Sequence, residues 1–171
     1  MRLLLPILLL VGTANAQAHL DTARVYIGTV EEPGNHGPEV ERFLASVGLG
    51  PGYPYCAAFV SYCLTAGGAV LPRTRSAVAQ RFISRYGRRA SDVKRGRCVP
   101  AGTIVIWKKG QGPYGHVGFV DQEWCGPSGW TIEANTSPGA GSQRDGDGVY
   151  RRYRTISPGS YFRIAGFTFV K

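Results

Sequence analysis

The sequence has no apolar run long enough to cross a membrane, no internal repeat and no low-complexity linker. Its longest apolar stretch, Leu3 to Val11, is well short of the roughly 20 residues that a spanning helix needs. The lack of self-similarity excludes repeat architectures. A chain of 171 residues is therefore predicted to form one compact domain with no transmembrane segment.

Metal-ligand spacings are also missing. The chain has 4 cysteines and 3 histidines, but no Cys-x-x-Cys or His-x-x-x-His pair. Such pairs are typical of zinc sites. We therefore expect no metal ion and no other cofactor.

Acidic residues are few, with 11 Asp and Glu against 20 Lys and Arg, and the net charge is +9. A basic excess favours polyanionic partners such as cell-wall polymers, anionic lipid surfaces or nucleic acid, although it also serves solubility alone. Basic residues cluster at 73–97 and 151–154, yet neither cluster has the signature of a nucleic-acid-binding module. No nucleic-acid partner is expected.

The first 16 residues have the pattern of a signal peptide. Arg2 precedes the apolar run, and Ala14-Asn15-Ala16 offers the small-x-small pattern that signal peptidase reads. Cleavage is expected after Ala16, and loss of Arg2 with this segment lowers the net charge from +9 to +8. The alternative, a buried N-terminal helix, lacks an amphipathic period. The mature protein is expected to be secreted or periplasmic.

Helical and strand periods occupy different parts of the chain. Apolar residues at helical spacing predict helices over 38–47, 56–66 and 76–85. Runs of β-branched and aromatic residues predict strands over 103–107, 116–120, 130–135, 148–154 and 162–170. Helices that precede a mostly antiparallel sheet are typical of the α+β class.

The segment 103–120 has the pattern of a β-hairpin around a turn rich in glycine. If Trp107 pairs with His116, the same register places Cys98 opposite Cys125, where a disulfide is plausible in an exported protein. The alternative is two free thiols, because Pro100 can break the register.

Four polar residues form a candidate catalytic set. Cys56 begins a predicted helix, where free N–H groups favour a thiolate, and Cys63 falls too far along that helix to pair with it. His116 begins a strand after a glycine and is a candidate general base. Glu133 and Asn135, two apart on a predicted strand, project from one face and can orient an imidazole. Taken singly, each residue has a structural interpretation, such as a core thiol.

Three segments, YPYCAAFVSYCL, GHVGFV and TIEANTS, together resemble the CHAP amidohydrolases. These are a branch of the NlpC/P60-like, papain-like cysteine peptidases that cut peptidoglycan. The segments NHGPEVERFLASVGL and DGDGVYRRYR also resemble parts of small single-domain bacterial members, so the resemblance covers nearly all of a domain at 20–171. It implies a papain-like α+β fold with N-terminal helices packed on the sheet.

The resemblance also implies a mechanism. Cys56 is expected to attack an amide carbonyl, His116 to accept and return the proton, and Glu133 with Asn135 to orient the ring. The backbone N–H of Cys56 is expected to help hold the oxyanion.

Tyr53 and Tyr55 border the nucleophile and are candidates for the substrate groove, with simple packing equally open for each. The expected function is that of a monomeric, secreted peptidoglycan hydrolase, either an N-acetylmuramoyl-L-alanine amidase or a stem or cross-bridge endopeptidase. The alternatives are a non-catalytic basic module that binds cell wall and an amidase acting on another peptide conjugate. An immunity or inhibitor partner leaves no trace in the sequence.

Overall fold

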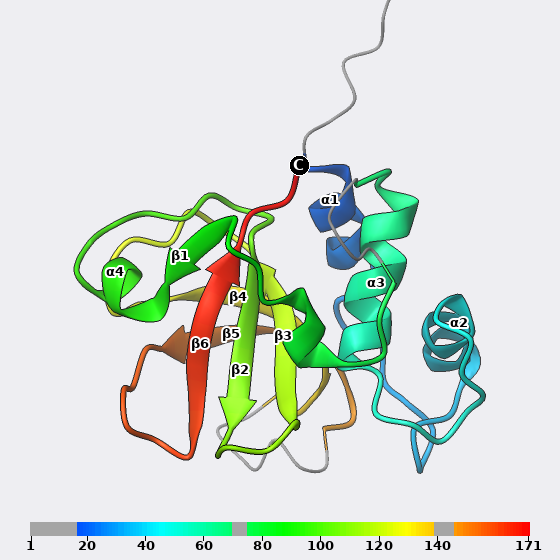
Figure 1. The fold of residues 1–171 in the computed structure, drawn as a ribbon. Coiled ribbons are helices and arrows are strands. Elements are labelled where there is room, and N and C mark those ends of the chain that lie inside the picture. Colours follow the sequence, from blue (N-terminus) through cyan, green and yellow to red (C-terminus); the bar gives the residue numbers. More distant parts are fainter. Residues whose placement is uncertain (1–16, 70–74, 139–145) are drawn as a thin grey trace, which may run out of the picture.

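The computed structural model describes residues 17–69, 75–138 and 146–171 (Figure 1). Its helices are α1 (Ala18–Val25), α2 (Pro38–Ser46), α3 (Cys56–Ala66), the 3₁₀ helix η1 (Ala79–Phe82) and α4 (Ala90–Lys94). Its strands are β1 (Gly87–Arg89), β2 (Ile104–Lys109), β3 (Gly115–Val120), β4 (Ser128–Thr136), β5 (Gly148–Thr155) and β6 (Phe162–Thr168). The expected signal peptide, residues 1–16, lies outside the described part, in which no helix is long and apolar enough to cross a membrane.

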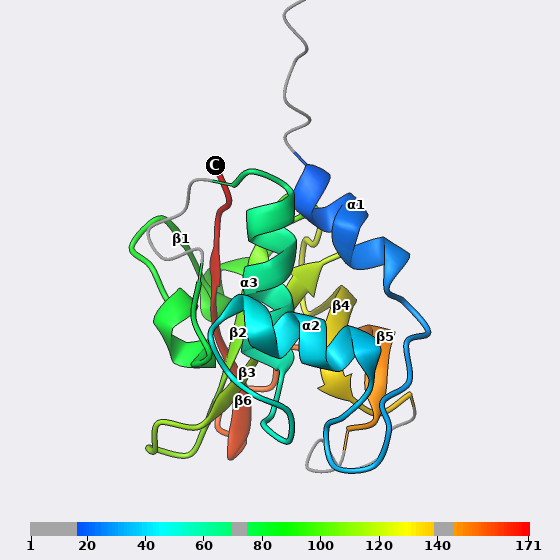
Figure 2. The ribbon, with the colours of Figure 1, turned by 90° about the vertical axis from the view of Figure 1, so that its right-hand side faces the viewer.

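The strands form one sheet in the order β1-β6-β2-β3-β4-β5, and all neighbouring strands are antiparallel. Helices α1, α2 and α3 gather on one side of this sheet, and Figure 2 views the molecule from that side. Helix α4 lies on the other side of the molecule from these three helices, next to β1 (Figure 1). The predicted α+β class, with N-terminal helices against an antiparallel sheet, is confirmed.

Two hydrophobic cores hold the layers together, one on each face of the sheet. In the first, Phe59 of α3 packs against Phe43 of α2 and Phe119 of β3, with ring centroids 5.2 and 6.5 Å apart. In the second, Trp124 packs edge-on against Phe167 of β6, 5.2 Å away. Helix α3 is apolar on nearly every side because it lies between α1, α2 and the sheet.

The sequence correctly predicted α2 and α3, whereas the helix expected over 76–85 is wrong. This segment contains the short η1, and the backbone becomes extended at Ile83. In this segment Phe82 is buried, but Val78 and Ile83 are exposed. The chain leaves the helical conformation here because β1 must pair with β6, and the hydroxyl of Thr168 donates to the carbonyl of Phe82 at 2.8 Å.

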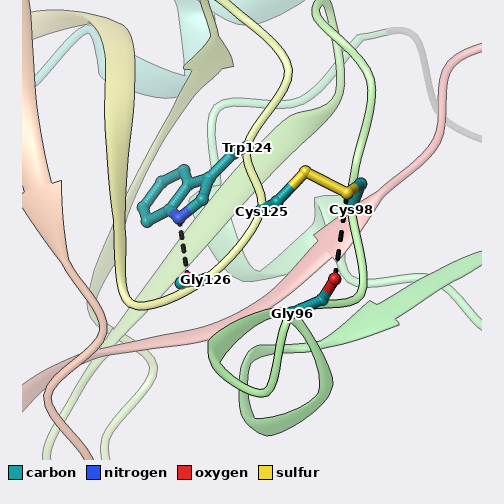
Figure 3. The surroundings of a disulfide bond; sticks show 5 residues. All are labelled: Gly96, Cys98, Trp124, Cys125 and Gly126. Carbon is teal, nitrogen blue, oxygen red and sulfur yellow. Dashed lines mark hydrogen bonds between the residues drawn. A yellow bond between two sulfur atoms is a disulfide. The ribbon is translucent and has the colours of Figure 1, made fainter.

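All five predicted strands are present, and Trp107 pairs with His116 as the hairpin pattern predicted. A β-bridge between Val99 and Trp124 extends this register beyond the hairpin. The structure joins the next residues, Cys98 and Cys125, in a disulfide (Figure 3).

Three short elements, α1, β1 and α4, were not predicted. Helix α1 begins at Ala18, so the expected domain start at Leu20 falls inside it. Its Arg24 donates from Nε to the Asp121 carboxylate at 3.0 Å and from Nη2 to the Asp121 carbonyl at 2.9 Å. These contacts attach α1 to the segment between β3 and β4.

Candidate active site

Helix α3 begins at Cys56, with Tyr55 as its N-cap. The Cys56 side chain is buried apart from 8% of its surface. The first N–H groups of a helix have no acceptor within it, and the helix dipole is positive at this end. Both effects stabilise negative charge on a sulfur or an oxygen placed at the start of α3.

His116 is the second residue of β3, which starts at the same end of the molecule as α3 (Figure 1). A Cβ on the preceding Gly115 would collide with the carbonyl oxygen of Trp107, so glycine permits the close pairing of β2 and β3. The imidazole packs beside two aromatic rings that stack on each other, with its centroid 5.3 Å from that of Trp107 and 6.3 Å from that of Phe162. This packing fixes the plane of the ring.

Glu133 lies on the middle of β4 and is fully buried. Its Oε2 is 2.8 Å from Nε2 of His116. Arg154 of β5 donates from Nε to Oε1 at 2.7 Å and from Nη2 to Oε2 at 2.5 Å, and the Thr131 hydroxyl donates to Oε1 at 2.5 Å. The carboxylate is thereby held by three side chains from β3, β4 and β5.

Arg154 and Thr131 were missed by the sequence analysis. Thr131 is two residues before Glu133 and therefore shares its face of the sheet. Arg154 pairs with Gly129, which puts it on the same face, but this follows from the β4–β5 register. Arg154 could therefore have been predicted from the sequence only if the register between β4 and β5 had been known.

The electrostatics favour a charged pair between Glu133 and His116. Burial opposes the charge on Glu133, but hydrogen bonds from Arg154 and His116 hold the pKa of this carboxyl well below its usual range. Burial also opposes the charge on His116, but its interactions with Cys56 and Glu133 raise its pKa to about 9. Because Nε2 faces Glu133, the ring nitrogen left for the sulfur of Cys56 is Nδ1.

Asn135 was expected to orient the same ring, and the structure gives it other partners. A register shift in β4 places Asn135 at a φ of 55°, which breaks the alternation of side chains. Its Oδ1 accepts from the Tyr55 N–H at 3.3 Å, and its Nδ2 donates to Asn35 Oδ1 and the Gly146 carbonyl, each at 3.1 Å. Asn135 thus fastens β4 to the start of α3 rather than to His116.

The two candidate groove tyrosines differ in exposure. Tyr53 has 54% of its surface exposed, on the segment that leads to the nucleophile candidate. Tyr55 is fully buried and stacks on Phe43, with ring centroids 6.4 Å apart. Burial, and then the nearby Glu31 carboxyl group, raise the pKa of its phenol. Tyr55 therefore packs in the core, which is the alternative that the sequence left open for it.

The remaining cysteines and buried histidine are structural. Cys63 is fully buried in α3, and burial raises the pKa of its thiol. His19 lies in the core, where its Nε2 is 2.9 Å from a backbone carbonyl.

In the described part of the chain, the one cluster of three potential metal ligands is Cys98, Glu123 and Cys125. Its two sulfurs are already joined to each other.

The model of the CHAP domain matches residues 48–135, a span that includes Cys56, His116, Glu133 and Asn135. No curated protein matches the chain. The matched span is more than half of the 171 residues, and a few helices with a six-stranded antiparallel sheet are consistent with the α+β fold of CHAP domains. This chain therefore belongs to the CHAP domain family.

Proposed function

We propose that this protein is a thiol-dependent peptidoglycan hydrolase that cleaves an amide bond. The bond is either the one between muramic acid and L-alanine or one within the stem or cross-bridge peptide. CHAP domains are typically hydrolases, which supports an enzyme. The observation that carries the proposal is the buried Glu133–His116 pair, whose Oε2 and Nε2 atoms lie 2.8 Å apart, together with the influence of Cys56 on the pKa of the same ring.

In the first step, the sulfur of Cys56, whose proton is held by His116, attacks the amide carbonyl carbon. A pKa of about 9 means that the imidazolium formed on His116 persists at neutral pH. The carbonyl oxygen becomes an oxyanion, and the Cys56 N–H at the start of α3 is positioned to donate to it. Glu133 balances the charge of the ring, and Arg154 keeps that carboxylate ionised.

In the second step, the C–N bond breaks and His116 protonates the departing amine. The acyl group stays on Cys56 as a thioester. Neutral His116 then takes a proton from water, whose oxygen attacks the thioester carbon and releases the carboxylic acid and the free thiol. Asn135 contributes as a positioning residue, because it fixes the backbone of Tyr55 immediately before the nucleophile.

The disulfide supports an exported protein. The Cys98–Cys125 disulfide fits an oxidising compartment, where peptidoglycan is accessible. We therefore retain cleavage after Ala16 and a catalytic domain at 20–171 as part of the proposal. N-terminal sequencing of the exported protein tests the cleavage position directly.

The decisive experiment is mass spectrometry of purified sacculi after digestion with the protein that begins at Gln17. New fragments are expected from the unmodified protein, and their masses identify the bond. Cys56→Ala should release none. Cys63→Ala is the matched control, because it removes the other free thiol of α3 and should keep the activity.

Two results would contradict the proposal. Equal release by the unmodified protein and Cys56→Ala would place the chemistry elsewhere. Unchanged sacculi that retain both proteins equally in the pellet would instead indicate a wall-binding module without catalysis.

A further inference from the structure

A cavity of about 600 Å³ lies at the β1 side of the sheet, away from the candidate active site. Its walls come from the segment 83–89, from α4 and the loop after it, from Ile106 of β2, and from β6 and the residue that follows. In the sheet, β6 and β2 separate β1 from the strand that carries His116. None of the residues of the Glu133–His116 pair or its arginine lines this cavity.

The cavity is strongly basic. Four arginines line it: Arg85, Arg88, Arg89 and Arg97. Within the described part of the chain, none of the four forms an ion pair with a carboxylate. The acidic residue in the wall, Asp92, is paired with Arg95 at 2.6 Å and so compensates little of their charge.

One arginine of the cavity, Arg88, has a nitrogen without an acceptor. Its Nε is buried and has no hydrogen-bond acceptor among the described residues. Its guanidinium lies 5.7 Å from the centre of the Phe169 ring, which also lines the cavity and holds the side chain in place. A buried N–H without an acceptor is unfavourable, and an anionic ligand in the cavity would supply one.

Strands β1 and β6, which form part of the cavity wall, lie very close to each other. A Cβ on Gly87 would collide with the carbonyl oxygen of Phe167, so glycine allows β1 to pair with β6 at this point. Arg88 and Arg89 follow directly on the same short strand. Their backbone positions are therefore fixed by the sheet rather than by a loop.

We propose that this arginine cavity binds a phosphate group. Arginine donates through a planar fork that matches phosphate oxygens, and several guanidiniums suit a dianion or a phosphodiester chain better than one carboxylate. Apolar side chains in the wall, among them Ile83 and Phe169, are available to the carbon part of a phosphorylated ligand. The site would hold a phosphorylated molecule or polymer on a surface separate from that of amide cleavage.

Isothermal titration calorimetry of the protein that begins at Gln17 tests the proposal, with inorganic pyrophosphate as the probe. Binding should be at least about tenfold weaker in Arg85→Gln/Arg88→Gln, because two guanidinium forks are lost. The matched control is Arg42→Gln/Lys94→Gln, which removes the same charge from positions outside the cavity and should bind within about twofold of the unmodified protein. If the first double variant does not fold, the exposed single variants Arg89→Gln and Arg97→Gln replace it.

Two further ligands distinguish between the molecules that could carry the phosphate group. Poly(glycerol phosphate) represents a soluble polymer, and phosphatidylglycerol vesicles represent a lipid surface. Stronger binding of either one, sensitive to the same arginines, assigns the source. Equal weakening in the variant and its control, or no binding of pyrophosphate, would overturn the proposal. Because the readout is binding, Cys56→Ala should bind pyrophosphate normally whatever the outcome for catalysis.

Discussion

Arg154 and Glu133 form a two-pronged ion pair across β4 and β5, with Nε–Oε1 and Nη2–Oε2 distances of 2.7 and 2.5 Å. The Oε2 that accepts from Arg154 also faces His116 at 2.8 Å. A carboxylate that is fully buried needs such compensation to stay ionised. The arginine therefore acts on the candidate active site through Glu133.

Replacing Arg154 with methionine should destabilise the protein by about 3 kcal/mol, because it leaves the buried Glu133 carboxylate without its main partner. Urea unfolding monitored by circular dichroism measures this change. Hydrolysis of sacculi should fall as well, since a protonated Glu133 no longer balances the imidazolium of His116. Arg163→Met on β6 is the control and should cost less than about 1 kcal/mol. Equal losses for the two variants would contradict the role given to Arg154.

Stability should depend on the protonation of His116. Its pKa rises from 6.5 to about 9 on folding, so the charged ring stabilises the folded state fully below pH 6.5. This contribution is lost as the pH rises through 9. The free energy of unfolding, measured from pH 6 to 9.5, should therefore fall more steeply in the unmodified protein than in His116→Gln. Parallel profiles would show that His116 has an ordinary pKa.

Two substitutions at Asn135 separate its backbone conformation from its hydrogen bonds. Asn135→Gly keeps the φ of 55° available but removes the acceptor of the Tyr55 N–H. Asn135→Ala removes the acceptor and adds strain of about 1 kcal/mol in this conformation. Both should lower kcat by about tenfold or more, because the start of α3 loses its tether to β4. A normal kcat in Asn135→Gly would rule out the positioning role.

The disulfide should matter for stability and not for catalysis. Cys98 and Cys125 close a loop with a sequence separation of 27, and a bond of this span is worth about 3 to 4 kcal/mol. Cys98→Ala/Cys125→Ala should lower the melting temperature, measured by differential scanning calorimetry, and keep its activity at 25 °C. Cys56→Ala should show the reverse, with a normal melting temperature and no activity.

Local sequence patterns were enough for much of the fold. The apolar spacing of 56–66 predicted α3 with its observed ends, and the alternation around Trp107 and His116 predicted the β2–β3 register. Such features depend on residues that are neighbours in the chain. The same is true of Cys56 and His116 as candidates, because each lies at the start of its own element. The helix expected over 76–85 failed because pairing of β1 with β6 overrode its local preference.

The sequence by itself determined which residues could do chemistry, and the tertiary structure decided which of them meet. Glu133 reaches His116 because β3 and β4 are paired, and Arg154 reaches Glu133 because β5 is paired with β4. Asn135 is turned away by a register shift that its alternating pattern does not contain. In the sequence, four arginines are dispersed along one basic segment. In the structure, pairing of β1 with the sheet brings all four to the wall of a single cavity. Burial and charge compensation depend on residues that are distant in the chain. They are therefore determined by how the elements pack and not by local sequence.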